Sequence, residues 1–149
     1  RELEKYAVRI GGGYNHRFRL DEMVLVKDNH LKVIGDRLWV IGFKEIKKKI
    51  SPKIQIEVEV KTLKEFKKAL KINPDIIMLD NMNLNAIKKA VKLRNNLSPN
   101  TYHLRPKLEA SGGIGLKNVR KFAAAGVEMI SVGELTHSLN SADISLEIL

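Results

Sequence analysis

The residues near the start of the chain that are best suited to chemistry are three basic side chains beside a run of glycines. Gly11–Gly13 precede His16 and Arg17, and Lys27 follows the apolar segment Met23–Val26. Three glycines let the backbone bend where side chains do not fit, and Arg and Lys donate strong hydrogen bonds to anions. A surface histidine and a salt-bridged arginine are the alternative interpretation. The spacing favours a pocket for carboxylates, in which Arg17 supplies a planar fork and Lys27 a point charge.

Two carboxylates, Glu59 and Asp80, lie at the carboxyl ends of two neighbouring predicted strands. Oxygen ligands of this kind hold Mg²⁺, often through water, beside a phosphorylated substrate. The alternative is a pair of carboxylates on solvent-facing strand ends. Because both carboxylates lie at the carboxyl ends of neighbouring strands, at the same height in the predicted sheet, the pattern favours a metal site. We expect Mg²⁺ there.

A phosphate site is predicted from two glycine-containing segments. Ser111, Gly112 and Gly113 precede a predicted helix, and Val132 and Gly133 end the strand that follows it. Exposed backbone N–H groups at the amino end of a helix bind phosphate. Glycine pairs serve turns at least as often. In (β/α) barrels, however, the last two such loops commonly share one phosphate site.

These residues must be positioned by strands, and the clearest strand covers residues 54–60. Apolar and polar residues alternate strictly from Ile54 to Val60, which places Gln55, Glu57 and Glu59 on one face. If helices cover the apolar face, the polar face points inward, with Glu59 nearest the carboxyl end. Glu57 then lies one layer deeper and is expected to pair with a cation. Side chains also alternate along the next predicted strand, and this places Asp80 on the inward face as well.

The other expected elements continue an alternation of strand and helix. Helices are predicted at 2–8, 37–50, 63–70 (capped by Thr62 and stopped by Asn73-Pro74), from Asn83 or Asn85 to 92, and at 116–125, closed by Gly126. Further strands are predicted at 76–79, 108–110 and 127–132. Residues 139–149 are predicted to form either a closing strand or a docked tail.

This alternation predicts an α/β fold with right-handed crossovers, a parallel sheet and helices outside. Five such units are too few for a complete eight-stranded barrel, so we expect an incomplete (β/α) barrel. All five candidate positions then lie at the carboxyl ends of strands, the rim that carries chemistry in barrels: Lys27, Glu59, Asp80, Ser111 and Gly133.

Composition narrows the classes of function. The 149 residues suit one domain, and the absence of cysteine excludes disulfides, thiolate nucleophiles and thiolate metal sites. No run of about eighteen apolar residues and no leader-type segment is present, so we expect a cytoplasmic protein without a membrane partner. The net charge of +10 raises the alternative of a non-catalytic nucleic-acid-binding module. Many lysines fall on predicted helix faces, so no nucleic-acid partner is expected.

The order of motifs resembles that of the quinolinate phosphoribosyltransferases, also called carboxylating nicotinate-nucleotide pyrophosphorylases. The resemblance covers nearly the whole chain, in the order Gly11–Arg17, Val26–His30, Ile56–Val60, Met78–Met82, Glu109–Ile114, Gly126-Val127, Ser131–Gly133, Leu135–Ser138 and Asp143–Leu146. It implies a barrel of that family's type. It also implies a pentosyltransferase of de novo NAD biosynthesis, which converts quinolinate and phosphoribosyl pyrophosphate to nicotinate mononucleotide, CO₂ and pyrophosphate with Mg²⁺.

The resemblance also implies roles for individual residues. His16, Arg17 and Lys27 would line the quinolinate pocket, whereas Glu59 and Asp80 would serve the ribose hydroxyls and the metal. Lys27, Glu59 and Asp80 would be the catalytic residues. The phosphate-binding set would comprise Ser111, Gly112, Gly113, Val132 and Gly133, with Glu134 beside it.

Two departures from the family pattern bear on these expectations. Glu134 replaces the alanine usual after Val-Gly and brings a carboxylate near the phosphate site. The chain, taken as one barrel domain over 1–149, is expected to lack the family's amino-terminal domain and a Thr-Arg-Lys-Thr segment on the first barrel strand. The family's dimers share their pockets between subunits, so we expect a homodimer or higher homo-oligomer and an inactive isolated fragment. The molybdenum-transport-associated paralogue, with a different acceptor, is the alternative enzyme.

Overall fold

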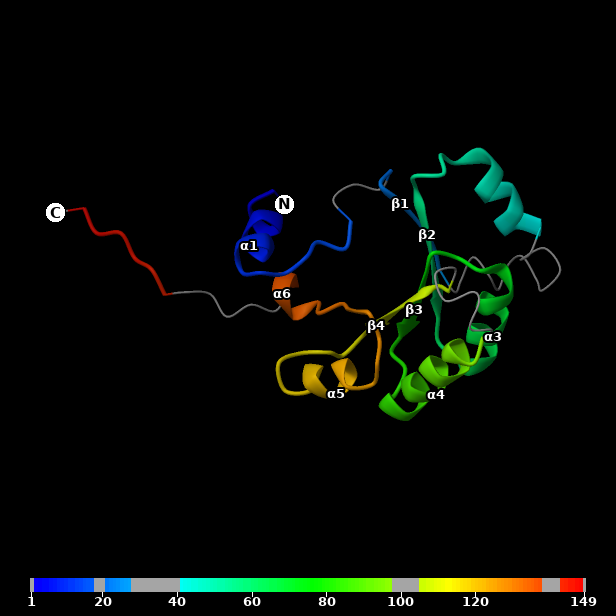
Figure 1. The fold of residues 1–149 in the computed structure, drawn as a ribbon. Coiled ribbons are helices and arrows are strands. Elements are labelled where there is room, and N and C mark those ends of the chain that lie inside the picture. The colour runs from blue at the N-terminus through cyan, green and yellow to red at the C-terminus, as the bar shows by residue number, and fades with distance from the viewer. Residues whose placement is uncertain (1, 18–20, 28–40, 98–104, 138–142, 149) are drawn as a thin grey trace.

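The computed structural model describes residues 2–17, 21–27, 41–97, 105–137 and 143–148. Strands and helices alternate through most of the chain (Figure 1), in the order α1 (Glu2–Ile10), β1 (Met23–Val26), β2 (Gln55–Val60), α3 (Leu63–Ile72), β3 (Ile76–Asp80), α4 (Leu84–Asn95), β4 (Lys107–Ser111), α5 (Val119–Ala123), β5 (Met129–Ile130) and α6 (Glu134–His137). Residues 41–49, between β1 and β2, are also helical. The predicted alternation is therefore confirmed.

The five strands form one parallel sheet in the order β1-β2-β3-β4-β5. Each strand pairs with the next one along the chain, as in a barrel, but in the described part of the chain β1 and β5 do not meet. The register pairs Val26 with Val58 and Asp80 with Ser111, so the carboxyl ends of the strands lie along one edge. This open parallel sheet confirms the prediction of an incomplete barrel.

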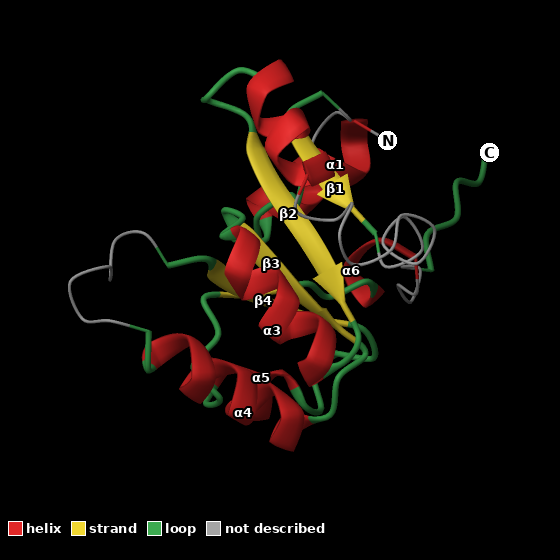
Figure 2. Cartoon of the chain, turned by 90° about the vertical axis from the view of Figure 1, so that its right-hand side faces the viewer, coloured by secondary structure: helices red, strands yellow, loops and turns green. Residues whose placement is uncertain are grey.

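The two faces of the sheet differ as the alternation in β2 predicts. Val58 and Val60 are fully buried in the hydrophobic core, together with Phe66 of α3 and Ile87 of α4. Helices α3 and α4 lie in front of this face in Figure 2. Glu57 is also fully buried but points to the opposite face, which is the inner face of the half-barrel.

The helix caps agree with the sequence. Thr62 caps α3 with a complete capping box, because its side chain accepts from Glu65 N while Glu65 Oε2 accepts from Thr62 N. The helix ends at Asn73, which adopts the left-handed conformation. Asn83, rather than Asn85, caps α4 by accepting from Ala86 N at 2.9 Å.

The helix predicted at 116–125 is shorter than expected, because α5 begins only at Val119. Asn118 explains the difference. Its Oδ1 accepts from Gly115 N and its Nδ2 donates to Gly113 O, both at 2.9 Å, so residues 113–118 remain a loop. Side chains that bond local backbone groups in this way compete with helix formation.

Other boundaries also shift. The strand predicted at 127–132 forms ladder pairs only at Met129–Ile130. The described tail, 143–148, has neither strand nor helix, and Ile144, Leu146 and Ile148 are exposed, so neither prediction for it is borne out there. Positions 37–40, 139–142 and 149 of the predicted elements lie outside the described residues.

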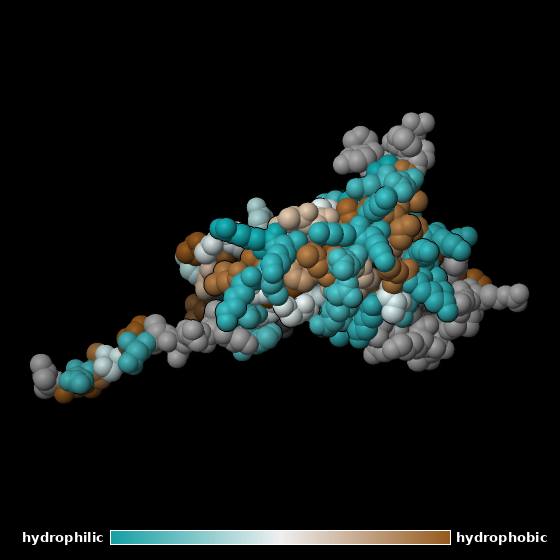
Figure 3. Space-filling view, turned by 90° about the horizontal axis from the view of Figure 1, so that it is seen from below, coloured by the Kyte–Doolittle hydropathy of each residue, from teal (hydrophilic) through white to brown (hydrophobic). Residues whose placement is uncertain are grey.

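The predicted lysine faces are exposed to solvent. Lys47, Lys48 and Lys49 in the helical segment 41–49 are exposed, as are Lys64, Lys67 and Lys71 of α3. Hydrophilic side chains cover much of the face seen in Figure 3. Within the described ranges, no helix has the length and apolar character needed to cross a membrane.

Candidate active site

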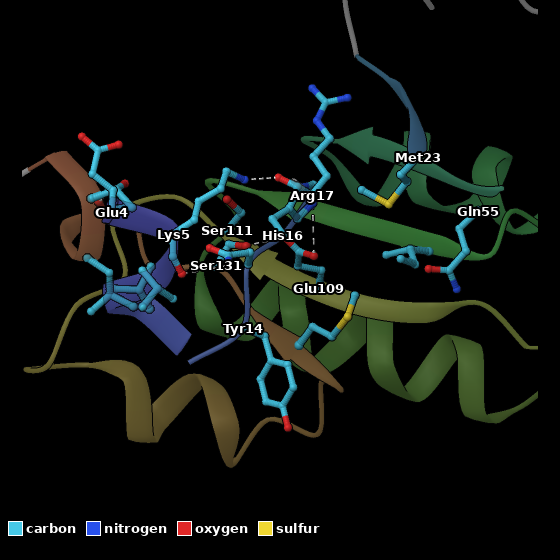
Figure 4. A pocket seen from close by; sticks show the side chains of 18 residues that line it. Glu4, Lys5, Tyr14, His16, Arg17, Met23, Gln55, Glu109, Ser111 and Ser131 are labelled. Carbon is cyan, nitrogen blue, oxygen red and sulfur yellow. Dashed lines mark hydrogen bonds and ion pairs between the residues drawn. The ribbon is translucent and has the colours of Figure 1, made fainter. Parts of the chain in front are cut away.

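A cleft of about 590 Å³ opens on the inner face of the sheet. It is bounded by α1, by the segment that follows the triple glycine and by the carboxyl ends of β4 and β5 (Figure 4). Its lining contains three basic side chains, Lys5, His16 and Arg17, beside neutral polar groups such as Asn15, Ser111 and Ser131, and two acidic ones, Glu4 and Glu109. The cleft therefore suits a small anionic ligand.

The triple glycine turns the chain from α1 into this cleft. Gly11 N donates to Ala7 O and Gly13 N donates to Val8 O, both at 2.9 Å, which closes the helix. Gly12 has φ +84°, a conformation that other residues rarely adopt. The glycines thus make the bend that the sequence predicted.

Hydrogen bonds between α1 and the segment after the glycines position His16 and Arg17. Asn15 Nδ2 donates to Lys5 O at 3.1 Å, and Lys5 Nζ donates to Arg17 O. Figure 4 shows Lys5 reaching across the cleft toward this segment. These two hydrogen bonds, each from a side chain to a backbone carbonyl, hold the segment that carries His16 and Arg17 against α1.

His16 is paired with two buried glutamates. Its Nε2 lies 2.7 Å from Glu57 Oε2 and 3.6 Å from Glu109 Oε2. The hydrogen bond with Glu57 raises the pKa of His16 against the opposing effect of burial. Burial, reinforced by the charge of Glu57, raises the pKa of Glu109 to about 6. The predicted pairing of Glu57 with a cation inside the barrel is confirmed, and the cation is His16.

Glu109 is a site residue that the sequence predictions missed. Its side chain is 3% exposed and lines the cleft. The signal was present, because Leu108 and Ala110 on either side of it face the hydrophobic core and so place Glu109 on the inner face.

Three of the predicted phosphate-site residues line the cleft: Ser111, Val132 and Gly133. Gly112 and Gly113 follow β4 with φ of +90° and +62°. A Cβ on Gly112 would lie 2.3 Å from Asn81 Oδ1, so glycine is required by space as well as by conformation. Since α5 begins at Val119 and not at residue 116, the loop between these glycines and the helix is longer than predicted.

Glu134 lies beside the same loop. Its Oε2 would be 2.2 Å from a Cβ placed on Gly115, so the carboxylate rests against the backbone of this glycine. His137, the last residue of α6, similarly lies over Gly133. The departure at Glu134 therefore brings negative charge to the loop of the predicted phosphate site, as expected.

Lys27, Glu59 and Asp80 lie at the edge of the sheet and are absent from the cleft lining. Lys27 directly follows β1. Lys61 Nζ lies 3.9 Å from Glu59 Oε1 and 3.8 Å from Asp80 Oδ2, so one cation already sits within reach of both carboxylates. A hard divalent cation would find oxygen ligands of the right chemistry at this point.

A second acidic cluster also has metal-ligand chemistry. His16, Glu57 and Glu109 each place one ligand atom within 4.8 Å of the others. This cluster was not the predicted metal site. His30, the last residue of the motif that begins at Val26, lies outside the described residues.

Comparison with known proteins gives a consistent result. The chain matches the family described as "Quinolinate phosphoribosyl transferase, C-terminal domain" over residues 1–147. It is 45% identical over 146 residues to the "Probable nicotinate-nucleotide pyrophosphorylase (carboxylating)" of Methanocaldococcus jannaschii, and 38% identical over 148 residues to the nicotinate-nucleotide pyrophosphorylase (carboxylating) of Mycobacterium leprae. These matches cover 98% and 99% of this chain and 50% and 49% of the two relatives. The chain thus spans about half the length of the curated relatives it matches.

Solved structures agree. A NadC deletion mutant matches with a TM-score of 0.78 and 37% identity, over 95% of this chain and 47% of that chain. NadC from Streptococcus pyogenes matches with a TM-score of 0.78 and 36% identity, over 98% of this chain and 48% of that chain. Thiamine phosphate pyrophosphorylase from Pyrococcus furiosus, with a TM-score of 0.54 and 19% identity, shares the fold alone.

Proposed function

The chain belongs to the quinolinate phosphoribosyl transferase family. We therefore propose that the full-length protein converts quinolinate and phosphoribosyl pyrophosphate to nicotinate mononucleotide, CO₂ and pyrophosphate. The observation that carries this proposal is the family match over residues 1–147. The mixed lining of the cleft supports it, because quinolinate brings two carboxylates and the second substrate brings phosphates. The relatives from M. jannaschii and M. leprae carry the name of this activity.

In this proposal, the acceptor binds next to the cations of the cleft. Arg17 offers a planar pair of donors that matches a carboxylate, and His16 contributes a second positive group. Lys27, at the carboxyl end of β1, supplies a further point charge. These three residues would orient the pyridine ring so that its nitrogen faces the ribose, which converts a bimolecular encounter into a positioned one.

The phosphoribosyl donor would lie along the carboxyl ends of β2 to β5. Backbone N–H groups near Ser111 and Gly133 would hold its phosphate, and Glu59 and Asp80 would contact the ribose hydroxyls. As the bond to pyrophosphate breaks, the ribose gains positive charge and the pyridine nitrogen forms the new bond. The quaternised nitrogen then withdraws electrons from the adjacent ring carbon. The bond to its carboxylate breaks, CO₂ leaves, and the carbon takes up a proton.

We propose Mg²⁺ as the cofactor at Glu59 and Asp80. The support is chemical, since both groups are oxygen ligands and both lie within 4 Å of one cation, the ammonium of Lys61. A bound Mg²⁺ would stabilise the charge of the leaving pyrophosphate. Within this chain, Lys61 would compete with the metal for the two carboxylates.

An assay of the full-length protein tests the function. Quinolinate, phosphoribosyl pyrophosphate and Mg²⁺ should yield nicotinate mononucleotide and CO₂ in equal amounts, detected by chromatography and by release from carboxyl-labelled quinolinate. Nicotinate in place of quinolinate is the matched control and should give little product. No product under saturating conditions would refute the proposal, and turnover only with another pyridine or pterin acceptor would favour the molybdenum-associated paralogue.

Lys61→Ala tests the metal site by a binding readout. Removal of the competing ammonium should tighten Mn²⁺ binding several-fold in calorimetry, because exposed ion pairs at this distance contribute up to about 1 kcal/mol. Lys64→Ala, an exposed lysine of α3, is the control. Unchanged Mn²⁺ affinity in Lys61→Ala would mean that the metal does not share these carboxylates with Lys61.

A further inference from the structure

The inner face of the half-barrel holds a buried polar chain that reaches the cleft at His16. Glu57 lies on β2 and Glu109 on β4, with side chains 0% and 3% exposed. The His16 side chain, which is 29% exposed, closes the gap between them, with Nε2 at 2.7 Å from Glu57 and 3.6 Å from Glu109. His16 is therefore the most exposed of the three, and it lines the cleft together with Glu109, whereas Glu57 lies behind the lining.

Ser131 extends the chain behind Glu109. Its Oγ donates to Glu109 Oε1 at 2.6 Å, while the other carboxylate oxygen, Oε2, is the one nearer His16. Ser131 directly follows β5, so the cluster joins residues of β2 and β4, the end of β5 and the segment after the triple glycine. Side-chain orientations fixed by packing and by hydrogen bonds in this way are those that define a binding geometry.

The charges explain why the cluster needs His16 in its protonated form. Two carboxylates removed from water are costly unless a cation faces them. Among the described residues, the salt bridges to Glu57 and to Glu109 come from His16 alone. Correspondingly, the pKa of His16 is raised, first through its hydrogen bond with Glu57, and burial raises the pKa of Glu109.

We propose that Glu57 and Glu109, with Ser131 behind Glu109, are positioning residues that hold His16 as an imidazolium with Nε2 turned toward the sheet. The second donor of the imidazolium, Nδ1, is then the one offered to a carboxylate of the acceptor. This inference rests on the proposed function for the identity of that ligand, but the orientation and charge of His16 belong to the protein itself. In this proposal, the two carboxylates act on the substrate through His16.

The first experiment measures His16 directly in the full-length protein without substrate. The nitrogen chemical shifts of ¹⁵N-labelled histidine report the protonation and tautomer of each ring. The His16 signals are identified because they are missing from the spectrum of His16→Gln. In the unmodified protein, His16 should remain protonated at a pH where exposed histidines are neutral. Glu57→Gln should lower the pKa of His16. Glu128→Gln, which alters a half-exposed carboxylate paired with Arg94 at 2.6 Å, is the control for an ion pair lost elsewhere and should leave His16 unchanged.

The second experiment asks whether the glutamates act through His16. Glu57→Gln should raise the KM for quinolinate about tenfold, the effect of losing one charge-assisted contact, and leave the KM for phosphoribosyl pyrophosphate unchanged. In a His16→Ala background, the same change should have little further effect, because interacting residues are non-additive. Equal losses in both backgrounds would overturn the proposal.

Two further outcomes are decisive. If Glu57→Gln does not fold, Ser131→Ala gives the weaker form of the same test, and an unchanged His16 spectrum in that variant would overturn the role of Glu109. Loss of Mn²⁺ binding in His16→Ala but not in Asp80→Asn would identify the cluster as a metal site and would also overturn the proposal. If quinolinate is not turned over at all, the function fails, whereas the nuclear magnetic resonance result still decides the state of His16.

Discussion

At the scale of single residues, the site residues predicted from the sequence divide into cations in the cleft and carboxylates at the carboxyl edge of the sheet. His16 and Arg17 line the cleft, while Glu59 and Asp80 flank Lys61 outside its lining. This separation matches two ligands of different chemistry, a small polycarboxylate and a phosphorylated sugar with its metal. Variants of the two groups should therefore affect the two substrates differently.

Arg17→Ala should weaken quinolinate binding more than phosphoribosyl pyrophosphate binding, by about ten- to a hundredfold in KM, because a charge-assisted hydrogen bond contributes about 1.5–3 kcal/mol. Lys27→Ala should act in the same direction. Asp80→Asn should do the reverse and shift the Mg²⁺ requirement. Steady-state kinetics of the full-length protein measure both constants, with exposed Arg120→Ala on α5 as control. Equal losses for both substrates would show that the site is not divided in this way.

The stability of the fold should depend on pH through Glu109. Its pKa is raised from 4.5 to about 6, so the folded state binds this proton more tightly than the unfolded state. The resulting stabilisation, about 2 kcal/mol for a shift of this size, is present below about pH 4.5 and is lost as the pH rises through about 6. The raised pKa of His16 acts with the same sign, since its contribution is lost as the pH rises through the folded value.

Glu109→Gln cannot ionise and should flatten this dependence. Urea unfolding of the unmodified protein and of the variant, at about pH 4.5 and about pH 7, gives the two differences in free energy. A smaller loss of stability in the variant is expected. The same loss in both proteins would show that Glu109 titrates normally.

At the scale of elements, the site residues are positioned by the carboxyl ends of the strands and by the loops that follow them. The candidate residues lie near the carboxyl ends of parallel strands, in the loops that follow them or in the segment after α1, and α3 and α4 pack on the outer face of the sheet. The loop after β4 is the most constrained, because two consecutive glycines there have positive φ and one of them abuts Asn81. This loop should tolerate substitution least.

Gly112→Ala should destabilise the protein by about 1–2 kcal/mol from its backbone conformation alone, with a further cost from the contact with Asn81. Gly42→Ala is the matched control, because nothing lies within 4 Å of its added Cβ and it sits in the helical segment 41–49. In a helix, alanine is favoured over glycine by roughly 0.5–1 kcal/mol. Thermal unfolding measures both variants, and equal effects would contradict the assigned loop geometry.

At the scale of the whole molecule, the open sheet is the dominant feature. Strands β1 and β5 are the two outer strands of five, and unpaired strand edges are templates for pairing with other chains. The chain also spans about half the length of its curated relatives. We propose that the complete activity requires the other half of the family's length, and that the full-length protein is a homodimer or higher homo-oligomer.

Residues 1–149 produced as a separate polypeptide should therefore associate and should not turn over quinolinate. Light scattering after size exclusion gives the mass of the particle, and the product assay gives the activity, with the full-length protein as control. Inorganic pyrophosphate should still bind, and calorimetry measures its affinity. A monomer as active as the full-length protein would contradict the prediction on both association and activity.

The sequence alone determined the features that depend on local periodicity and capping. The alternation in β2 placed Glu57 and Glu59 on the inner face, Thr62 marked the start of α3, and the order of motifs identified the family. The start of α4 was narrowed to Asn83 or Asn85. These features were predictable because each is encoded within a few consecutive residues.

Tertiary structure decided which distant groups meet. The pairing of His16 with Glu57 and Glu109, the late start of α5 and the position of Lys61 between two carboxylates were not predicted. The sequence indicated a cation for Glu57 but did not identify it, because that choice depends on how the glycine turn packs over the sheet. Burial and the nearest opposite charge are set by segments far apart in the chain, and they determine the pKa of Glu109 and the charge of His16.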